Sequence, residues 1–205
     1  MADIIPPVPP VPTLINAGCG STKGRLPPLF ADWHQLRIDI NPEVEPDIVT
    51  SLTDLSAIPS GCAQAVWASH CIEHLFAHEV PAALSEFQRV LLEDGFVCIV
   101  VPDLQSIASW IASDRLYDTI YESPAGPVTA HDMFWGFGPA IERGQVAMAH
   151  RCGFTPMAIQ HCLERVGFAE IVVRRRPTLE LLALAFCQSP TEAGLRDRLI
   201  SQLGF

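Results

Sequence analysis

Short apolar segments that alternate with helix-like segments fill the first half of the chain. Five of them, at residues 13–17, 35–40, 47–52, 65–69 and 96–101, have the length of strands. Strands with one solvated face alternate apolar and polar residues, whereas strands of a parallel sheet are buried on both faces and read as apolar runs. Because these segments lack a polar face, they predict a mostly parallel sheet covered on both sides by helices.

Two helices and a final pair of strands complete the predicted fold. Residues 81–91 carry apolar side chains at helical spacing, and a second helix begins at Thr155 and stops at Gly167. The connection between the strand-like runs 169–175 and 179–187 is too short for a parallel crossover, so we expect an antiparallel pair. The predicted fold class is α/β: a Rossmann-like, doubly wound, mostly parallel sheet with a C-terminal antiparallel strand pair.

The 205 residues fit a single domain, 13–205, preceded by a short arm. Residues 1–12 form this arm, since the proline-rich run within it cannot pair as a central strand. Residues 115–153 contain several glycines and prolines and have only weak periodicity. A structureless loop of this length is uncommon in a compact domain unless it is a lid or a substrate-binding insertion, which is our interpretation of 115–153.

Composition excludes several classes of function. The formal net charge of −10 repels phosphate backbones, so we expect no nucleic-acid partner. No apolar run reaches the ~18 residues of a membrane span, and the N-terminal residues lack the pattern of a signal peptide. The seven cysteines are an odd number without a CxxC pair, which is typical of buried thiols in a reducing cytoplasm and argues against a disulfide framework.

A glycine loop follows the first predicted strand, and an acidic residue lies about twenty residues after this loop. Gly18 and Gly20 let backbone amides approach a ligand at the carboxyl end of a strand, where open α/β sheets bind ligands. Asp39, at the end of the second strand, can accept both hydroxyls of a ribose. The third glycine of the dinucleotide fingerprint is absent, because Lys23 stands at its position, and this disfavours a nicotinamide enzyme.

Five motifs occur in a fixed order over residues 13–103: LINAGCGS, RIDIN, PDIVTSLTDL, AVWASHCIEHL and EFQRVLLEDGFVCIVVPD. In this order they resemble the class I S-adenosylmethionine-dependent methyltransferases of the type 11 group. The resemblance implies the seven-stranded methyltransferase fold, an insertion on the acceptor side, and methyl transfer from S-adenosyl-L-methionine to a small-molecule acceptor. The alternatives are a degenerate, non-catalytic S-adenosylmethionine-binding protein and, with less support, a nicotinamide-dependent oxidoreductase.

The resemblance also implies which residues contact the cofactor. They come from the first motif, the end of the second strand, the third-strand region and the exit of the fourth strand: Asn16, Gly18, Cys19, Gly20, Asp39, Ile40, Ser51, Leu52 and Ser69. Two positions depart from the family pattern. Ser51 replaces the usual Asp at the adenine edge unless Asp54 serves instead, and Gln64 stands where an Asp often opens the fourth strand.

Three histidines are spaced four apart after the fourth strand: His70, His74 and His78. On a helix this spacing spreads them over ~12 Å along one face, too far to reach one ion. We therefore expect no metal. The resemblance places His70 beside the amino-acid end of the cofactor, whereas His74 either packs at the strand-to-helix turn or faces the acceptor pocket.

Two further histidines, His131 and His150, lie within the insertion and near several aromatic residues. Histidine is the side chain most often poised as a base near neutral pH, so either residue can deprotonate an acceptor. The catalytic candidates are thus His131, His150, His70 and His74. The aromatic residues fit an acceptor pocket, the core of the insertion itself, or the contact of a homodimer.

Overall fold

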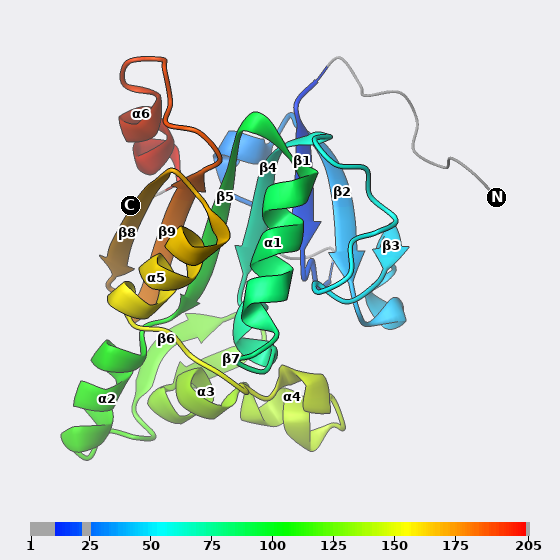
Figure 1. Cartoon of the computed structure of the whole chain (residues 1–205). Coiled ribbons are helices and arrows are strands. Elements are labelled where there is room, and N and C mark those ends of the chain that lie inside the picture. Colours follow the sequence, from blue (N-terminus) through cyan, green and yellow to red (C-terminus); the bar gives the residue numbers. More distant parts are fainter. Residues whose placement is uncertain (1–10, 22–25, 204–205) are drawn as a thin grey trace.

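The computed structural model describes residues 11–21 and 26–203, and within them a seven-stranded sheet is the centre of the molecule (Figure 1). The strand order is β3-β2-β1-β4-β5-β9-β8, and β1 to β5 are mutually parallel. Most of the arm predicted at 1–12 lies outside the described residues. The strands are β1 (Thr13–Ala17), β2 (His34–Asp39), β3 (Ile48–Val49), β4 (Ala63–Ser69), β5 (Leu91–Pro102), β8 (Glu170–Arg176) and β9 (Glu180–Phe186).

The two faces of the sheet bury separate apolar clusters. Helices α1 (Val80–Val90) and α5 (Pro156–Val166) cover one face, where side chains such as Phe87 and Leu163 pack on the sheet (Figure 1). Helix α6 (Leu195–Gln202) packs on the other face with Phe30 and Trp67. The alternation of side chains along each strand supplies both clusters, so the central strands are buried on both sides as predicted.

The antiparallel edge of the sheet is confirmed. β9 pairs antiparallel with β5 on one side and with β8 on the other, and all seven of its residues are buried. The predicted α/β class with a parallel sheet and a terminal antiparallel pair is therefore correct.

The connections after β1, β2 and β3 differ from the expected alternation of strands and helices. Between β1 and β2 the described residues contain only a 3₁₀ helix, Pro28–Phe30, and another, Pro42–Val44, precedes β3. The strand predicted at 47–52 is only two residues long, and after it the side chains of Thr50 and Ser51 make local hydrogen bonds with Asp54 and Thr53.

The segment between β5 and α5 forms a compact unit with its own apolar cluster around Ile107, Val128 and Met133. It lies at the end of the sheet toward which the parallel strands run (Figure 1). The predicted insertion at 115–153 contains regular elements, and α2 packs into the same cluster. The elements are α2 (Leu104–Ala112), β6 (Thr119–Ser123), β7 (Gly126–Thr129), α3 (Ala130–Trp135), α4 (Gly138–Glu142) and a 3₁₀ helix, Val146–Met148.

Helix α3 shows how local sequence builds the insertion. Thr129 and Asp132 form a capping box, in which each side chain bonds the other residue's backbone N–H. No helix in the described parts of the chain is long and apolar enough to cross a membrane.

Two glycines of the insertion allow a matched stability test. Gly136 and Gly144 both have positive φ, but a Cβ on Gly136 would lie 2.1 Å from the carbonyl oxygen of Met148, whereas Gly144 has open space. Gly144→Ala should cost about 1–2 kcal/mol of backbone strain. Gly136→Ala should cost about 1–3 kcal/mol more, because the backbone must shift. Denaturant unfolding measures both, and equal losses would contradict the packing.

Candidate functional site

The glycine loop leaves β1 in a left-handed conformation. Gly18 has φ +64° and Gly20 has φ +55°, and the N–H of Cys19 donates to the carbonyl of Ile38 at 2.9 Å. A Cβ on Gly18 would lie 2.4 Å from the Cβ of Cys71, so this glycine lets the loop contact the exit of β4. A Cβ on Gly20 would meet nothing within 4 Å, so its free side faces open space.

Asp39 holds the glycine loop against the end of β2. Its Oδ2 accepts the N–H of Gly20 at 2.8 Å, and its Oδ1 accepts the N–H of Asn41 at 2.9 Å. Each carboxylate oxygen can accept a second hydrogen bond, so both remain able to bind ligand hydroxyls.

Arg37 is a supporting residue that the sequence interpretation missed. Its guanidinium donates to the carbonyls of Gly20, Val44 and Glu45 at 2.6–3.0 Å. It lies two residues before Asp39 and therefore on the same face of β2, which is the signal that identifies it in retrospect.

The remaining predicted cofactor residues surround this loop. Ile40 is 63% exposed although it is apolar, whereas Leu52 is buried. Ser51 bonds the hydroxyl of Thr53, and the side chain of Asn16 donates to Gln35 on β2. Ser69 ends β4.

Asp54, the alternative to the Asp that is absent at Ser51, caps its own turn. Its Oδ1 accepts the N–H of Ser56, and hydrogen bonds from Ser56, the side chain first, lower the pKa of Asp54.

His70 forms a second polar centre directly after β4. It has φ +51°, and its Nε2 lies 2.8 Å from Oε1 of Glu180, while its Nδ1 lies 3.2 Å from Oε1 of Glu73. Burial lowers the pKa of His70, but the two carboxylates outweigh burial and raise the pKa to about 10. His70 is therefore a cation at neutral pH and cannot act as a base.

Glu180 was not recognised from the sequence. It opens β9, an otherwise apolar strand, and it also accepts the hydroxyl of Thr178. A lone carboxylate in an apolar strand is the signal that could have found it, since such a group needs a buried partner.

Glu73 brings two more histidines together. The ring centroids of His74 and His150 are 5.0 Å apart, and both imidazoles lie beside Glu73. Burial raises the pKa of Glu73, but the neighbouring imidazoles, His70 first, outweigh burial and lower it. Burial also lowers the pKa of His150, against the opposing effect of Glu73.

The helical spacing assumed for residues 70–78 is wrong. Only Ile72–His74 is helical, as one 3₁₀ turn, and α1 begins at Val80. As a result His70 and His74 lie on either side of Glu73, while His78 is exposed and stacks on Phe76.

His131 lies in a different environment. Its ring packs between Tyr117 and Trp135, at centroid distances of 5.5 and 5.0 Å, and both of these aromatic side chains are exposed. The structure thus groups three of the four candidate histidines around Glu73 and places the fourth in an aromatic group of the insertion.

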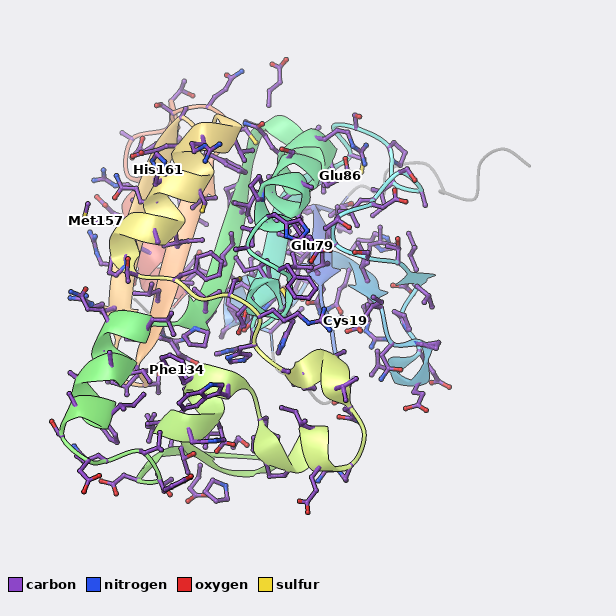
Figure 2. All side chains as sticks on the ribbon, turned by 60° about the horizontal axis from the view of Figure 1, so that its bottom comes forward. Cys19, Glu79, Glu86, Phe134, Met157 and His161 are labelled. Atoms are coloured by element: carbon purple, nitrogen blue, oxygen red, sulfur yellow. The ribbon has the colours of Figure 1, made fainter. Side chains whose placement is uncertain are left out.

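The glycine loop and the insertion lie toward the same end of the molecule. Figure 2 shows Cys19 of the glycine loop and Phe134 of α3 toward that end, whereas His161 of α5 lies toward the opposite end. The N–H groups of Arg151 and Cys152 both donate to the carbonyl of Glu73, at 2.9 and 3.2 Å, and connect the insertion to the exit of β4.

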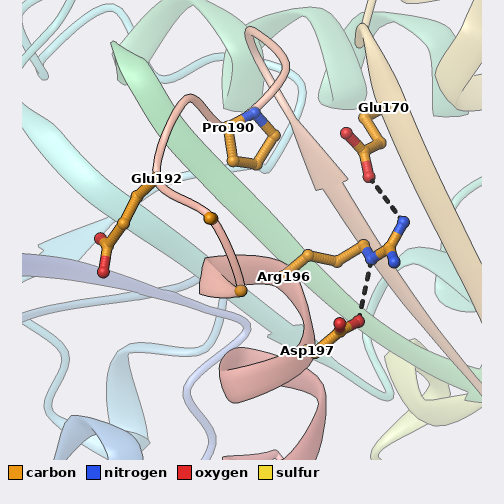
Figure 3. Close-up of a pocket in the computed structure, with 7 residues that line it drawn as sticks. Glu170, Pro190, Glu192, Arg196 and Asp197 are labelled. Atoms are coloured by element: carbon orange, nitrogen blue, oxygen red, sulfur yellow. Dashed lines mark hydrogen bonds and ion pairs between the residues drawn. The ribbon is translucent and has the colours of Figure 1, made fainter.

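A shallow surface pocket of about 210 Å³ lies elsewhere, before α6 (Figure 3). Its Arg196 pairs with Glu170 at 3.3 Å and with Asp197 at 3.1 Å. Glu170 is the first residue of β8, which runs parallel to β5, so this pocket is at the amino ends of the strands and away from the site.

Comparison with known proteins agrees with this geometry. Residues 15–99 match the family model of a methyltransferase domain. A S-adenosylmethionine-dependent methyltransferase from Archaeoglobus fulgidus has 13% identity and a TM-score of 0.59, with 86% of each chain covered. One from Methanosarcina mazei has 17% identity and a TM-score of 0.56, over 86% of this chain and 91% of that chain.

A third similar structure, from Haloferax volcanii, is described as a methyltransferase in complex with its methyltransferase activator. It has 14% identity and a TM-score of 0.55, over 89% of this chain and 85% of that chain. No curated protein matches the sequence.

The fold and the matched domain define the class of protein. Residues 15–99 match a methyltransferase domain, and the fold is that of S-adenosylmethionine-dependent methyltransferases of known structure, a class whose cofactor is S-adenosylmethionine. The residues fit this cofactor: Gly20 leaves open space at the loop, Asp39 has free acceptor capacity, and Ile40 offers an exposed apolar surface.

Asp39 is expected to carry much of the cofactor affinity. Hydrogen bonds to a charged group contribute roughly 1.5–3 kcal/mol. Asp39→Ala should therefore weaken S-adenosylhomocysteine binding by roughly one to two orders of magnitude in calorimetric titration. Asp47→Ala is the control, because Asp47 accepts a backbone N–H from Arg37 at the outer side of β2. Unchanged affinity in Asp39→Ala would refute the assignment.

The two glycines of the loop should respond differently to substitution. Gly20→Val should lose cofactor binding and cost only about 1–2 kcal/mol of backbone strain from its positive φ, because its Cβ meets no protein atom. Gly18→Val should destabilise the fold further, because its Cβ also collides with Cys71. Calorimetry and thermal unfolding of both variants test this, and normal binding by Gly20→Val would reduce the loop to a simple turn.

Proposed function

We propose that this enzyme methylates a small-molecule acceptor that binds between the carboxyl ends of the strands and the insertion. The observation that supports the proposal is the arrangement of the two halves: a left-handed glycine loop with Asp39, and a separately packed insertion at the same end of the sheet. The cofactor half is common to the family, so the acceptor must be recognised by residues outside it.

Asn16, Gly18, Cys19 and Gly20 would wrap the amino-acid and ribose parts of the cofactor. Asp39 would accept the ribose hydroxyls, Ile40 would pack on the adenine, and Ser51 and Leu52 would line its edge. Ser69 would lie at the amino-acid end. When bound, S-adenosylmethionine supplies an activated methyl group with a good leaving group.

The contribution of this chain is then mainly alignment and exclusion of water. Tyr117, His131 and Trp135 present exposed aromatic surface that suits a small organic acceptor. We assign the base, where the acceptor must lose a proton, to His131. The reason is that His70 is held as a cation, and His74 and His150 share Glu73.

A reducing, cytoplasmic location is part of the proposal. It is supported by the seven cysteines, which are all free thiols. Burial raises the pKa of each of these thiols. Protonated thiols of this kind are poorly reactive.

Calorimetry with S-adenosylhomocysteine, followed by acceptor screening with labelled cofactor, tests the proposal. Binding and turnover of a small molecule support it. Binding without turnover of any small molecule or protein supports the non-catalytic alternative, and absence of binding refutes the proposal.

His131→Ala should lower turnover by about 10²–10⁴-fold, because a positioned base contributes that much. Cofactor affinity should stay near that of the wild type, since the ring of His131 packs against Tyr117 and Trp135 of the insertion. His161→Ala, on α5, is the control.

A role of the aromatic group in a homodimer would give another result. The His131 variant would then change sedimentation behaviour and leave the turnover of the monomer unaltered. That outcome would remove the base assignment.

A further inference from the structure

Glu73 is a fully buried carboxylate without a hydrogen-bond donor. Neither of its oxygens has a hydrogen-bond partner, and His70 approaches Oε1 at 3.2 Å as an ion pair only. Burying a charge with incomplete partners costs several kilocalories per mole in real proteins, so such groups usually have another charge beside them.

Two imidazoles face the same carboxylate in a defined orientation. His74 Nδ1 lies 3.2 Å from the carbonyl oxygen of Ala149, and His150 Nδ1 lies 3.0 Å from that of Met133. A carbonyl oxygen can only accept, so each Nδ1 carries the proton and each Nε2 is left with a lone pair. Histidines that bind metals are held in this way, by a second hydrogen bond from the other ring nitrogen.

The three side chains converge. One ligand atom each from Glu73, His74 and His150 lies within 4.8 Å of the others. Ligands of one tetrahedral Zn²⁺ at 2.0–2.1 Å lie about 3.4 Å apart, so side-chain movements of about an ångström close the site.

We propose that Glu73, His74 and His150 bind one divalent transition-metal ion of the Zn²⁺ class. Two imidazoles and a carboxylate suit Zn²⁺, Fe²⁺ or Co²⁺, whereas Mg²⁺ and Ca²⁺ prefer oxygen ligands alone. Three protein ligands leave a fourth position open, which is typical of catalytic rather than structural metal sites.

This proposal revises the expectation of no metal. That expectation considered the histidines at 70, 74 and 78 on one helix, and it holds for those three. The folded chain replaces two of them by Glu73 and by His150, which comes from the insertion.

Metal titration of the chelator-treated protein tests the proposal. Co²⁺ should bind with one equivalent, produce visible d–d bands of low symmetry, and be displaced by Zn²⁺ but not by Mg²⁺. Glu73→Gln, His74→Gln and His150→Gln should each weaken Co²⁺ binding by at least about 100-fold, since loss of a second-shell partner alone costs 10–100-fold.

His78→Gln is the matched control. His78 is exposed and stacks on Phe76 close to the same segment, and its variant should bind Co²⁺ like the wild type. Circular dichroism shows whether each variant folds. If a histidine variant does not fold, thermal unfolding of the other proteins tests the proposal instead. Zn²⁺ should raise the melting temperature of the wild type and of His78→Gln, but not of Glu73→Gln.

Two results would overturn the proposal. One is the absence of saturable Co²⁺ binding by the wild type, which would leave Glu73 as a counter-ion of the imidazoles only. The other is equal binding by His150→Gln and His78→Gln. The d–d bands require neither cofactor nor acceptor, so failure of this proposal is distinguishable from failure of the proposed methyl transfer.

Discussion

Burial of the central strands on both faces is the constraint on which the rest of the structure depends. β1 and β9 have no exposed residue, and the apolar side chains of β4 and β5 fill the clusters on the two faces of the sheet. Polar side chains that bind ligands or take part in a reaction therefore have to lie where the strands end. The backbone must also turn sharply there, which explains the positive φ angles of Gly18, Gly20 and His70 at the carboxyl ends of β1 and β4.

Glu73 couples the two halves of the molecule. Its backbone carbonyl accepts the N–H groups of Arg151 and Cys152, which follow the insertion, and its side chain lies among His70, His74 and His150. The insertion is thus attached to the exit of β4 by the same residue that carries the buried charge. The exit of β4 and the insertion are therefore linked through both the backbone and the side chain of Glu73.

The sequence predicts the parts of the fold that depend on local pattern. The apolar strands, the amphipathic helix at 81–91 and the short connection of the final strand pair each have a nearby signal, and the structure confirms them. The partners of Glu73 and Glu180 have no such signal, although a lone carboxylate in an apolar strand marks Glu180 itself. Their contacts with His70 and His150 join residues that are up to 110 positions apart, and periodicity carries no information on such pairs.

The prediction of one helical face for three histidines was wrong for a related reason. They are His70, His74 and His78. An interval of four residues indicates one helical face only if the segment is a helix, and here the chain makes a single 3₁₀ turn after a left-handed residue. The glycine loop and Asp39 were easier to place, because strand, loop and acid occur in chain order and meet through neighbouring strands.

The surroundings of each histidine determine which chemistry it can perform. Both ring nitrogens of His70 face carboxylates, so the ring is held as a cation and joins the exit of β4 to the start of β9. His74 and His150 each face a carbonyl through Nδ1, which leaves Nε2 available to bind a cation. His131 has neither kind of partner and packs against the exposed rings of Tyr117 and Trp135. One residue type therefore occupies three different environments, and the proposed roles of ion-pair partner, metal ligand and base follow from these differences.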